Sequence, residues 1–187
     1  RPPGEPRDEA SPPGTGFLAE VAVEWERAAE PARAAGIRVV HPRFGLVLSP
    51  RGGALPPLLR LFRLGLGGPI GDGRQVWSWV ALGDVVGALL HLLGSEAVAG
   101  PVNVVAPNPV SNEEFARTLA RVLGRPARLR APAGLLRLAL GEMADEMLLA
   151  GARVVPRRLL ESGYAFRFAE LEPALRHLLG AGTEDPA

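Results

Sequence analysis

A glycine-rich stretch, GTGFLA at residues 14–19, has the residue types and spacing of a dinucleotide-binding fingerprint. In that motif the glycines follow a buried strand and open a helix, whose N-terminal N–H groups bind a pyrophosphate. Here residues 1–13 are rich in proline and charge and show no strand pattern. The motif also needs an acid for the ribose after the next strand, where this chain has His41, Pro42 and Arg43. Two interpretations remain, a nucleotide-binding loop or an ordinary helix start, and this context favours the helix start.

Other groups that commonly perform catalysis are missing from the chain. All 21 Lys and Arg residues are arginine, so these residues offer no phosphate-loop lysine, no Schiff-base lysine and no Tyr-Lys proton relay. Cysteine is absent, which excludes a thiol nucleophile and a cysteine metal site. The three histidines, at positions 41, 91 and 177, do not have the spacing of metal ligands. We therefore expect no metal site.

The composition bounds the function classes. A length of 187 residues with 47% apolar residues suits one domain, or one domain with a small appendage. The net charge of +1 argues against a general nucleic-acid binder, and we expect the arginines of residues 117–130 to form a solvated face. The sequence contains no run of 18 apolar residues, so we expect no membrane span. The lack of cysteine fits a cytoplasmic location. Because position 1 is Arg, we expect either an N-terminally truncated fragment or a numbering that begins partway along a longer chain.

Hydrophobic periodicity, proline and glycine predict the elements that would position any site. We expect helices over residues 17–30, within 51–65, and over 84–94, 115–123, 135–140, 143–149, 156–162 and 171–179. We expect strands over residues 37–48 (interrupted at Pro42), 75–80, 100–107, 125–132 and 164–168. Strands and helices alternate almost throughout, which predicts an α/β fold with a parallel sheet.

Several side chains have expected roles at helix ends and faces. Ser111 and Glu114 form a capping box that begins the helix after them. Asp84 is expected to cap the helix that follows it. Along that helix, Val85, Val86, Leu89, Leu92 and Leu93 are expected to face the core, with His91 on the solvent side.

Five stretches occur in an order that resembles a known family. They are FLAEVAVEWERAA, RFGLVLSPRGGAL, RLGLGGPIGDGRQVWSWV, GPVNVVAPNPVSNEEFARTLA and GARVVPRRLLESGYAFRFAELEPAL. These stretches lie between residues 17 and 175, and the resemblance as a whole covers roughly residues 8–178. They resemble the sugar-nucleotide-epimerase-like family of atypical extended short-chain dehydrogenases/reductases, which carries a small C-terminal domain of unknown function. The resemblance implies that residues 1–125 are the C-terminal part of a doubly wound Rossmann-like sheet. It also implies a small, mainly helical domain at 126–180, followed by a tail at 181–187.

The resemblance implies NADP (or NAD) as cofactor, with the phosphate-binding loop outside this chain. In ordinary members of the superfamily the helix at residue 17 carries a Tyr-x-x-x-Lys pair, and the corresponding positions here are Phe17 and Val21. Phe cannot donate a proton and Val cannot hold a ribose. By the resemblance, the cofactor-binding residues would be Arg43, Phe44 and Gly45, which would lie beside the nicotinamide end of the cofactor. The alternative for Arg43 is a structural arginine paired with a carboxylate.

By the same resemblance, Gln75, Trp77 and Trp79 would line the substrate pocket, where they could bind a nucleotide-sugar-like small molecule. The alternative is that the two tryptophans, at alternate positions, are half core and half surface. Asn103 is expected to be a buried structural residue. The function implied is that of an NADP(H)-binding epimerase-like or oxidoreductase protein. The resemblance is also compatible with an oligomeric protein. The alternative is a non-catalytic nucleotide-binding or interaction protein that has lost the Tyr-Lys pair.

Overall fold

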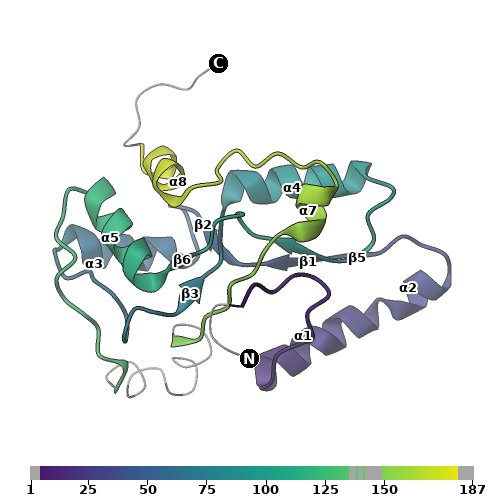
Figure 1. Cartoon of the computed structure of the whole chain (residues 1–187), viewed down its shortest axis with the longest axis horizontal. Coiled ribbons are helices and arrows are strands. Elements are labelled where there is room, and N and C mark those ends of the chain that lie inside the picture. Colours follow the sequence, from purple (N-terminus) through teal and green to yellow (C-terminus); the bar gives the residue numbers. More distant parts are fainter. Residues whose placement is uncertain (1–4, 135–137, 139–140, 142–148, 181–187) are drawn as a thin grey trace.

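A computed structural model of the chain describes residues 5–134, 138, 141 and 149–180. Figure 1 shows the arrangement of the elements in this part of the chain. The helices are α1 (Phe17–Ala28), α2 (Glu30–Ala34), α3 (Leu55–Arg63), α4 (Leu82–Gly94), α5 (Asn112–Val122), α7 (Arg157–Glu161) and α8 (Leu171–Leu178). The strands are β1 (Val40–Phe44), β2 (Leu46–Leu48), β3 (Val76–Trp77), β4 (Trp79–Ala81), β5 (Gly100–Val104) and β6 (Val110–Ser111). The expected α/β class is confirmed.

Parallel pairing dominates the sheet structure. β1 pairs with β5 and β2 pairs with β4, both in parallel, whereas β3 and β6 form a short antiparallel pair. The chain passes from β1 to β2 at Gly45, so one extended segment leaves one partner strand and joins another. The break expected at Pro42 is therefore wrong, because Pro42 lies inside β1 opposite Val102. Among the described strands β1 has a single neighbour, so the missing N–H of Pro42 can face the unpaired side.

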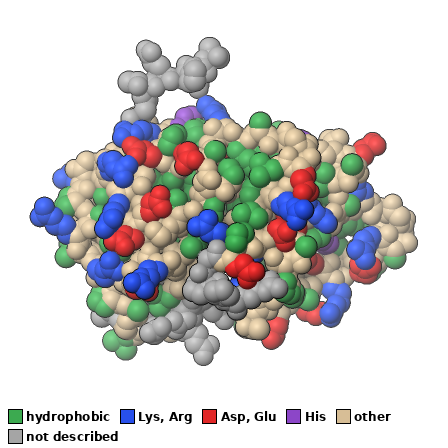
Figure 2. Space-filling model, in the orientation of Figure 1, with side chains coloured by type: hydrophobic (Ala, Val, Ile, Leu, Met, Phe, Trp, Pro, Cys, Tyr) green, Lys and Arg blue, Asp and Glu red, His purple; other side chains and the backbone are tan. Residues whose placement is uncertain are grey.

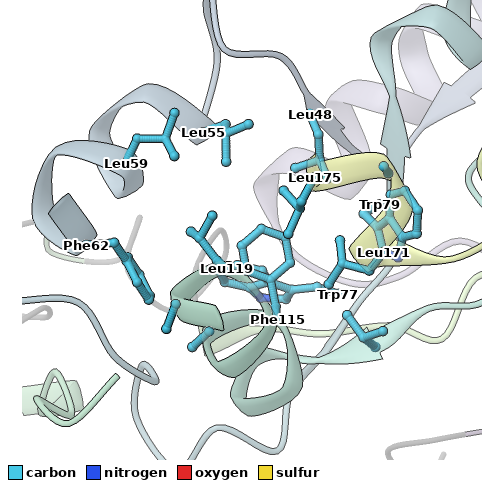
Figure 3. Packing of buried hydrophobic residues seen from close by; sticks show 14 of the residues in the cluster. Leu48, Leu55, Leu59, Phe62, Trp77, Trp79, Phe115, Leu119, Leu171 and Leu175 are labelled. Atoms are coloured by element: carbon cyan, nitrogen blue, oxygen red, sulfur yellow. The ribbon is translucent and has the colours of Figure 1, made fainter. Parts of the chain in front are cut away.

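Two clusters of buried side chains form the core of the described part. In the first cluster, residues from α3, α5 and α8 surround Trp77 and Trp79, as Figure 3 shows. The Trp77 and Phe115 rings meet edge to face, with 5.1 Å between their centroids. The second cluster fills the space between the parallel strands and the helices α4 and α7. Its members are Val80, Val85, Ala88, Leu92, Val102, Val104 and Leu159.

The C-terminal helix α8 belongs to the first cluster. Leu171, Ala174 and Leu175 are buried there against residues from the first half of the chain. In Figure 1, α8 and α5 lie next to each other at one end of the molecule. The boundary at residues 125 and 126 stays a prediction.

Helix α1 forms where the sequence predicts it but buries none of its residues. Its apolar residues Phe17 and Trp25 are 70% and 76% exposed. Gly16, just before it, has a φ of 103°, which suits glycine and explains a helix start at this point. Among residues 5–15, which the structure describes, Arg7 forms one isolated bridge to Val154 and no strand occurs, so the fingerprint interpretation of GTGFLA is wrong.

Two expected strands are not strands. Residues 125–132 are irregular apart from one bridge between Ile70 and Ala131, and residues 164–168 have no strand structure. The helices expected at residues 135–140 and 143–149 fall almost entirely outside the described residues.

Helix α4 corrects three expectations. It begins at Leu82 with Ala81 as the N-cap residue, so Asp84 is not the cap but a buried residue of the first turn. Val86 and Leu93, expected in the core, are exposed. His91 is half-buried rather than solvent-facing, and its Nε2 atom lies 2.9 Å from the hydroxyl of Ser162.

Arginine and acidic side chains are interspersed over the face of the molecule in Figure 2. Many of the described arginines pair with carboxylates, such as Arg117 with Glu113 on α5 and Arg121 with Glu172 on α8. This agrees with the solvated face expected for the arginines of residues 117–130.

Candidate functional site

Two clefts meet near the carboxyl ends of the parallel strands. The smaller, which we call the α1 cleft, has a volume of about 360 Å³ and lies between α1, the irregular residues 7–14 and the end of β1. Phe44, Gly45 and Val105 line it, directly after β1 and β5. In open α/β sheets, ligands bind outside the carboxyl ends of the strands. The α1 cleft therefore lies where such a fold binds a ligand.

The larger cleft, which we call the apolar pocket, has a volume of about 810 Å³. It lies between α3, β3 and two later stretches of the chain, residues 129–131 and 150–154. Arg7, Ala152 and Val154 line both clefts, so the two spaces adjoin. A ligand in one cleft would thus lie beside a ligand in the other.

Arg43 lies at the α1 cleft and pairs with Glu26 of α1. Its Nε and Nη2 atoms donate to the two carboxylate oxygens of Glu26 at 2.6 and 2.8 Å, a bidentate geometry. This hydrogen-bonded pair lowers the pKa of Glu26 and raises the pKa of Arg43. Glu26 uses two of the five guanidinium N–H groups, and the remaining three are available to a ligand. The carboxylate partner expected for a structural Arg43 is present, and cofactor contact stays compatible with it.

Gly45 allows the chain to change strand partners. A Cβ atom at this position would collide with the carbonyl oxygen of Ser78 and with the Val105 side chain. The N–H of Gly45 still points to the β5 residue Val104, at 3.4 Å, whereas the N–H of Leu46 donates to Ser78 at 2.7 Å. Glycine is therefore required for the close approach of three backbone segments at the floor of the α1 cleft.

Helix α1 turns a face without acid–base groups toward the cleft, apart from Glu26. The lining residues on this face are Ala19, Ala22, Val23 and Glu26. Phe17 and Val21, the positions expected for the Tyr-Lys pair, are not part of the lining. On the cleft side the same spacing of four residues is occupied by Ala19 and Val23, which cannot transfer a proton either.

The expected substrate residues do not come together at one surface. Trp79 is completely buried in the core, and its indole N–H donates to the carbonyl of Asn108. Trp77 lines the apolar pocket and is 9% exposed. Gln75 donates from its side-chain amide to the carbonyl of Ile70 at 3.0 Å and does not line the pocket. Of the three, the structure places only Trp77 at a cavity.

Two buried carboxylates have structural roles that the sequence did not reveal. One oxygen of Glu9 accepts the N–H groups of Asn103 and Arg158, and its other oxygen has no partner among the described residues. Asp84 accepts the N–H groups of Arg167 and Phe168. No sequence signal identifies either pair, since the residues of each lie more than 80 positions apart. Asn103 is buried as expected, and its amide also donates to the carbonyl of Val155.

Tyr164, the single tyrosine, packs against α4. Its hydroxyl donates to the Asp84 carbonyl at 3.0 Å and lies 3.3 Å from the Asp84 carboxylate. Burial, followed by the nearby Asp84 charge, raises the pKa of Tyr164 to about 12. Tyr164 does not line either cleft and therefore does not replace the missing catalytic tyrosine.

The described residues offer neither a metal-binding cluster nor a membrane-spanning helix. No three or more His, Cys, Asp or Glu side chains gather closely enough to hold a metal ion. None of the described helices is long and apolar enough to cross a membrane.

The chain is similar to several known proteins. A domain of unknown function, DUF1731, matches residues 131–178. "Epimerase family protein Mb2239" of Mycobacterium bovis is 45% identical over 168 residues, which are 90% of this chain and 56% of that protein. The chain thus spans a little over half the length of the curated relatives it matches.

Two solved structures share the fold. The crystal structure of human epimerase family protein SDR39U1 (isoform 2) with NADPH has a TM-score of 0.89 and 40% identity, over 95% of this chain and 60% of that one. A nucleoside-diphosphate sugar epimerase from Corynebacterium glutamicum has a TM-score of 0.77 and 36% identity, over 95% of this chain and 34% of that one. The sheet described above therefore corresponds to part of a Rossmann-like fold.

Proposed function

This chain belongs to the epimerase family of extended short-chain dehydrogenase-like proteins, and on that premise we propose that the complete protein binds NADP(H) with the nicotinamide end in the α1 cleft. The position of this cleft, directly after β1 and β5 and beside the Arg43–Glu26 pair, is the observation that carries the proposal. The human relative, solved with NADPH, supports it.

Within the α1 cleft, the proposal gives one role to the side chain of Arg43 and another to the backbone of Phe44 and Gly45. Arg43 donates from its free N–H groups to a ribose or phosphate oxygen of the cofactor. The backbone at Phe44 and Gly45 forms the floor against which the nicotinamide ring lies, because no side chain at position 45 blocks the approach. The phosphate-binding loop would be supplied by residues outside this chain.

The reaction class is that of an epimerase-like or oxidoreductase protein. NADP(H) supplies a hydride when it is bound, and the chain's own residues orient the ring and exclude water from the cleft. A nucleotide-sugar-like substrate, a cytoplasmic location and a boundary near residue 125 between the Rossmann-like part and a small C-terminal domain all stay predictions.

A second candidate is a nucleotide-binding protein without turnover. The observation that favours it is the cleft face of α1, where Ala19 and Val23 provide no proton donor. A hydride transfer to a carbonyl needs a proton as well, so the two candidates differ in whether another residue of the complete protein supplies one.

The test is an NADPH titration of the protein expressed from its complete reading frame, followed by nicotinamide fluorescence. We expect Arg43→Ala to weaken binding by at least about tenfold, equivalent to about 1.4 kcal/mol. Arg27→Ala is the matched control, because Arg27 also pairs with a glutamate of α1, Glu24, but does not line the cleft. We expect it to leave the affinity unchanged.

Glu26→Gln separates cofactor contact from a structural role for Arg43. If Arg43 only ties β1 to α1, then Glu26→Gln and Arg43→Ala should weaken NADPH binding to the same extent. If Arg43 contacts the cofactor, Glu26→Gln frees the guanidinium and should not reduce the affinity. An intact protein that shows no NADPH binding would exclude the proposal.

A further inference from the structure

Few polar side chains line the apolar pocket. Its described lining includes Leu46, Leu58, Phe62 and Ile70, and the only side chains with a hydroxyl or charge are Ser78 and Arg7. Ser78 is already engaged, because its hydroxyl donates to the Ala152 carbonyl at 2.7 Å and accepts the N–H of Val154 at 2.8 Å. Among the described lining residues, Arg7 is therefore the one charged group that a ligand in this pocket would meet.

Three leucines of the lining are left half exposed. Leu61, Leu66 and Leu129 are 48%, 53% and 52% exposed, although they line a pocket of about 810 Å³. Exposed apolar side chains that converge on one cavity carry a free-energy cost in water, which a bound apolar molecule removes. A volume of this size is typical of small-molecule sites.

The wall formed by the C-terminal part of the chain is held in place by backbone hydrogen bonds. The N–H of Gly71 donates to Ala131 at 2.9 Å, and the N–H of Ala152 donates to Val76 at 3.1 Å. A Cβ atom at Gly68 would collide with the carbonyl of Leu129. The pocket is thus a fixed space between two parts of the chain.

Arg7 is positioned by its backbone rather than by its side chain. Its N–H donates to Arg153 at 2.7 Å, and its carbonyl accepts the N–H of Val155 at 2.9 Å. Its half-buried side chain makes no hydrogen bond or ion pair within the part of the chain that the structure describes. Arg7 lines both the apolar pocket and the α1 cleft, so this residue lies where the two spaces meet.

We propose that the apolar pocket binds a mainly hydrocarbon molecule that carries one carboxylate, with the carboxylate on the guanidinium of Arg7. A planar carboxylate matches the N–H fork of arginine, and the hydrocarbon part fills the leucine-lined space. A sugar nucleotide has a pyrophosphate and several hydroxyls, which need more donors than the lining offers. The proposal rests on the NADP(H) site in the α1 cleft, because Arg7 would then hold the polar end of the ligand beside the nicotinamide.

The probe is dodecanoate, titrated calorimetrically into the protein expressed from its complete reading frame, with and without saturating NADPH. We expect binding with a negative change in heat capacity, which marks the burial of apolar surface. Arg7→Ala should weaken dodecanoate binding by at least about tenfold, whereas Arg63→Ala, outside the pocket lining, should not change it. Because the Arg7 side chain makes no hydrogen bond or ion pair with the described residues, its removal should leave the fold intact.

A second pair of variants tests the apolar wall. Leu61→Glu should abolish dodecanoate binding, because it places a second negative charge in the pocket, which repels the carboxylate of dodecanoate. Leu64→Glu is the matched control, since Leu64 lies one residue beyond α3, is 72% exposed and does not line the pocket. Equal binding by the two variants would overturn the proposal.

Titration with UDP-glucose and with NADPH separates the remaining outcomes. UDP-glucose binding that is lost in Leu61→Glu, without dodecanoate binding, would overturn the proposal in favour of a sugar nucleotide. NADPH binding without dodecanoate binding would overturn this proposal and leave the proposed function standing. Dodecanoate binding without NADPH binding would support the pocket and overturn the cofactor site.

Discussion

Arg43 and Glu26 show how far residue types can be interpreted without a structure. The sequence identifies Arg43 as a residue that either contacts a cofactor or pairs with a carboxylate, and the structure supplies the carboxylate. The partner could not have been predicted, because Glu26 lies 17 residues away on a helix whose orientation depends on tertiary packing. The same holds for Glu9 and Asp84, whose partners are distant backbone N–H groups.

The Arg43–Glu26 pair should make the stability of the protein depend on pH. Because Arg43 lowers the pKa of Glu26 in the folded state, the pair contributes stability above the unfolded-state pKa of about 4.5. That contribution is lost as the pH falls through the lower, folded-state pKa. Since the Arg43 side chain is 40% exposed, we expect about 0.5–1 kcal/mol, reduced by salt.

The measurement is urea unfolding of the wild type and Glu26→Gln between pH 3 and pH 7. The difference in unfolding free energy should be largest near neutral pH and should shrink toward pH 3. A difference that is constant with pH would mean that the charge of Glu26 does not contribute.

At the scale of elements, sequence signals that depend on local geometry were the most reliable. The capping box at Ser111 predicted where α5 begins, because the hydrogen bond that it depends on lies within one turn. The predictions of strands at residues 125–132 and 164–168 are wrong. Alternating apolar residues also occur in irregular segments whose N–H groups bond elsewhere, as those of residues 167 and 168 bond to Asp84.

Removal of the α5 cap gives a test at this scale. The hydroxyl of Ser111 accepts the N–H of Glu114 at 3.1 Å, so Ser111→Ala leaves that N–H without its partner. We expect a loss of about 1 kcal/mol in the free energy of unfolding, measured with urea. Ser111→Asp keeps an acceptor and should retain most of the stability, and a similar loss in both variants would contradict the capping role.

At the scale of the whole molecule, the alternation of strands and helices predicted the α/β class and the resemblance predicted the family, but periodicity could not reveal how the parts pack. Helix α1 is amphipathic in sequence, yet Phe17 and Trp25 are exposed, because amphipathicity does not specify which surface covers a helix. Helix α8 belongs to the expected small C-terminal domain at 126–180, and its Leu171 and Leu175 lie in a cluster that includes Trp79.

This shared cluster predicts a single unfolding transition. Leu175 is completely buried, and Leu175→Ala should cost about 2–5 kcal/mol. All three tryptophans lie within residues 25–79, so their fluorescence reports on the first part of the chain. We expect Leu175→Ala to lower the urea midpoint of the tryptophan signal and of the helical circular dichroism together. An unchanged tryptophan midpoint would show that residues 126–180 unfold independently.

The buried carboxylate of Asp84 has a consequence for the timescale on which the molecule opens. Backbone amides in a segment without helix or strand ordinarily exchange with solvent deuterium quickly. The amides of Arg167 and Phe168, held at 2.7 and 3.0 Å by a side chain that is 2% exposed, should instead exchange as slowly as those of α4 and β5. Mass spectrometry of deuterated peptides would detect this protection, and in Asp84→Ala it should disappear from these two amides while α5 keeps its own. The two amides of the irregular stretch between α7 and α8 would then exchange on the same timescale as the amides of the core.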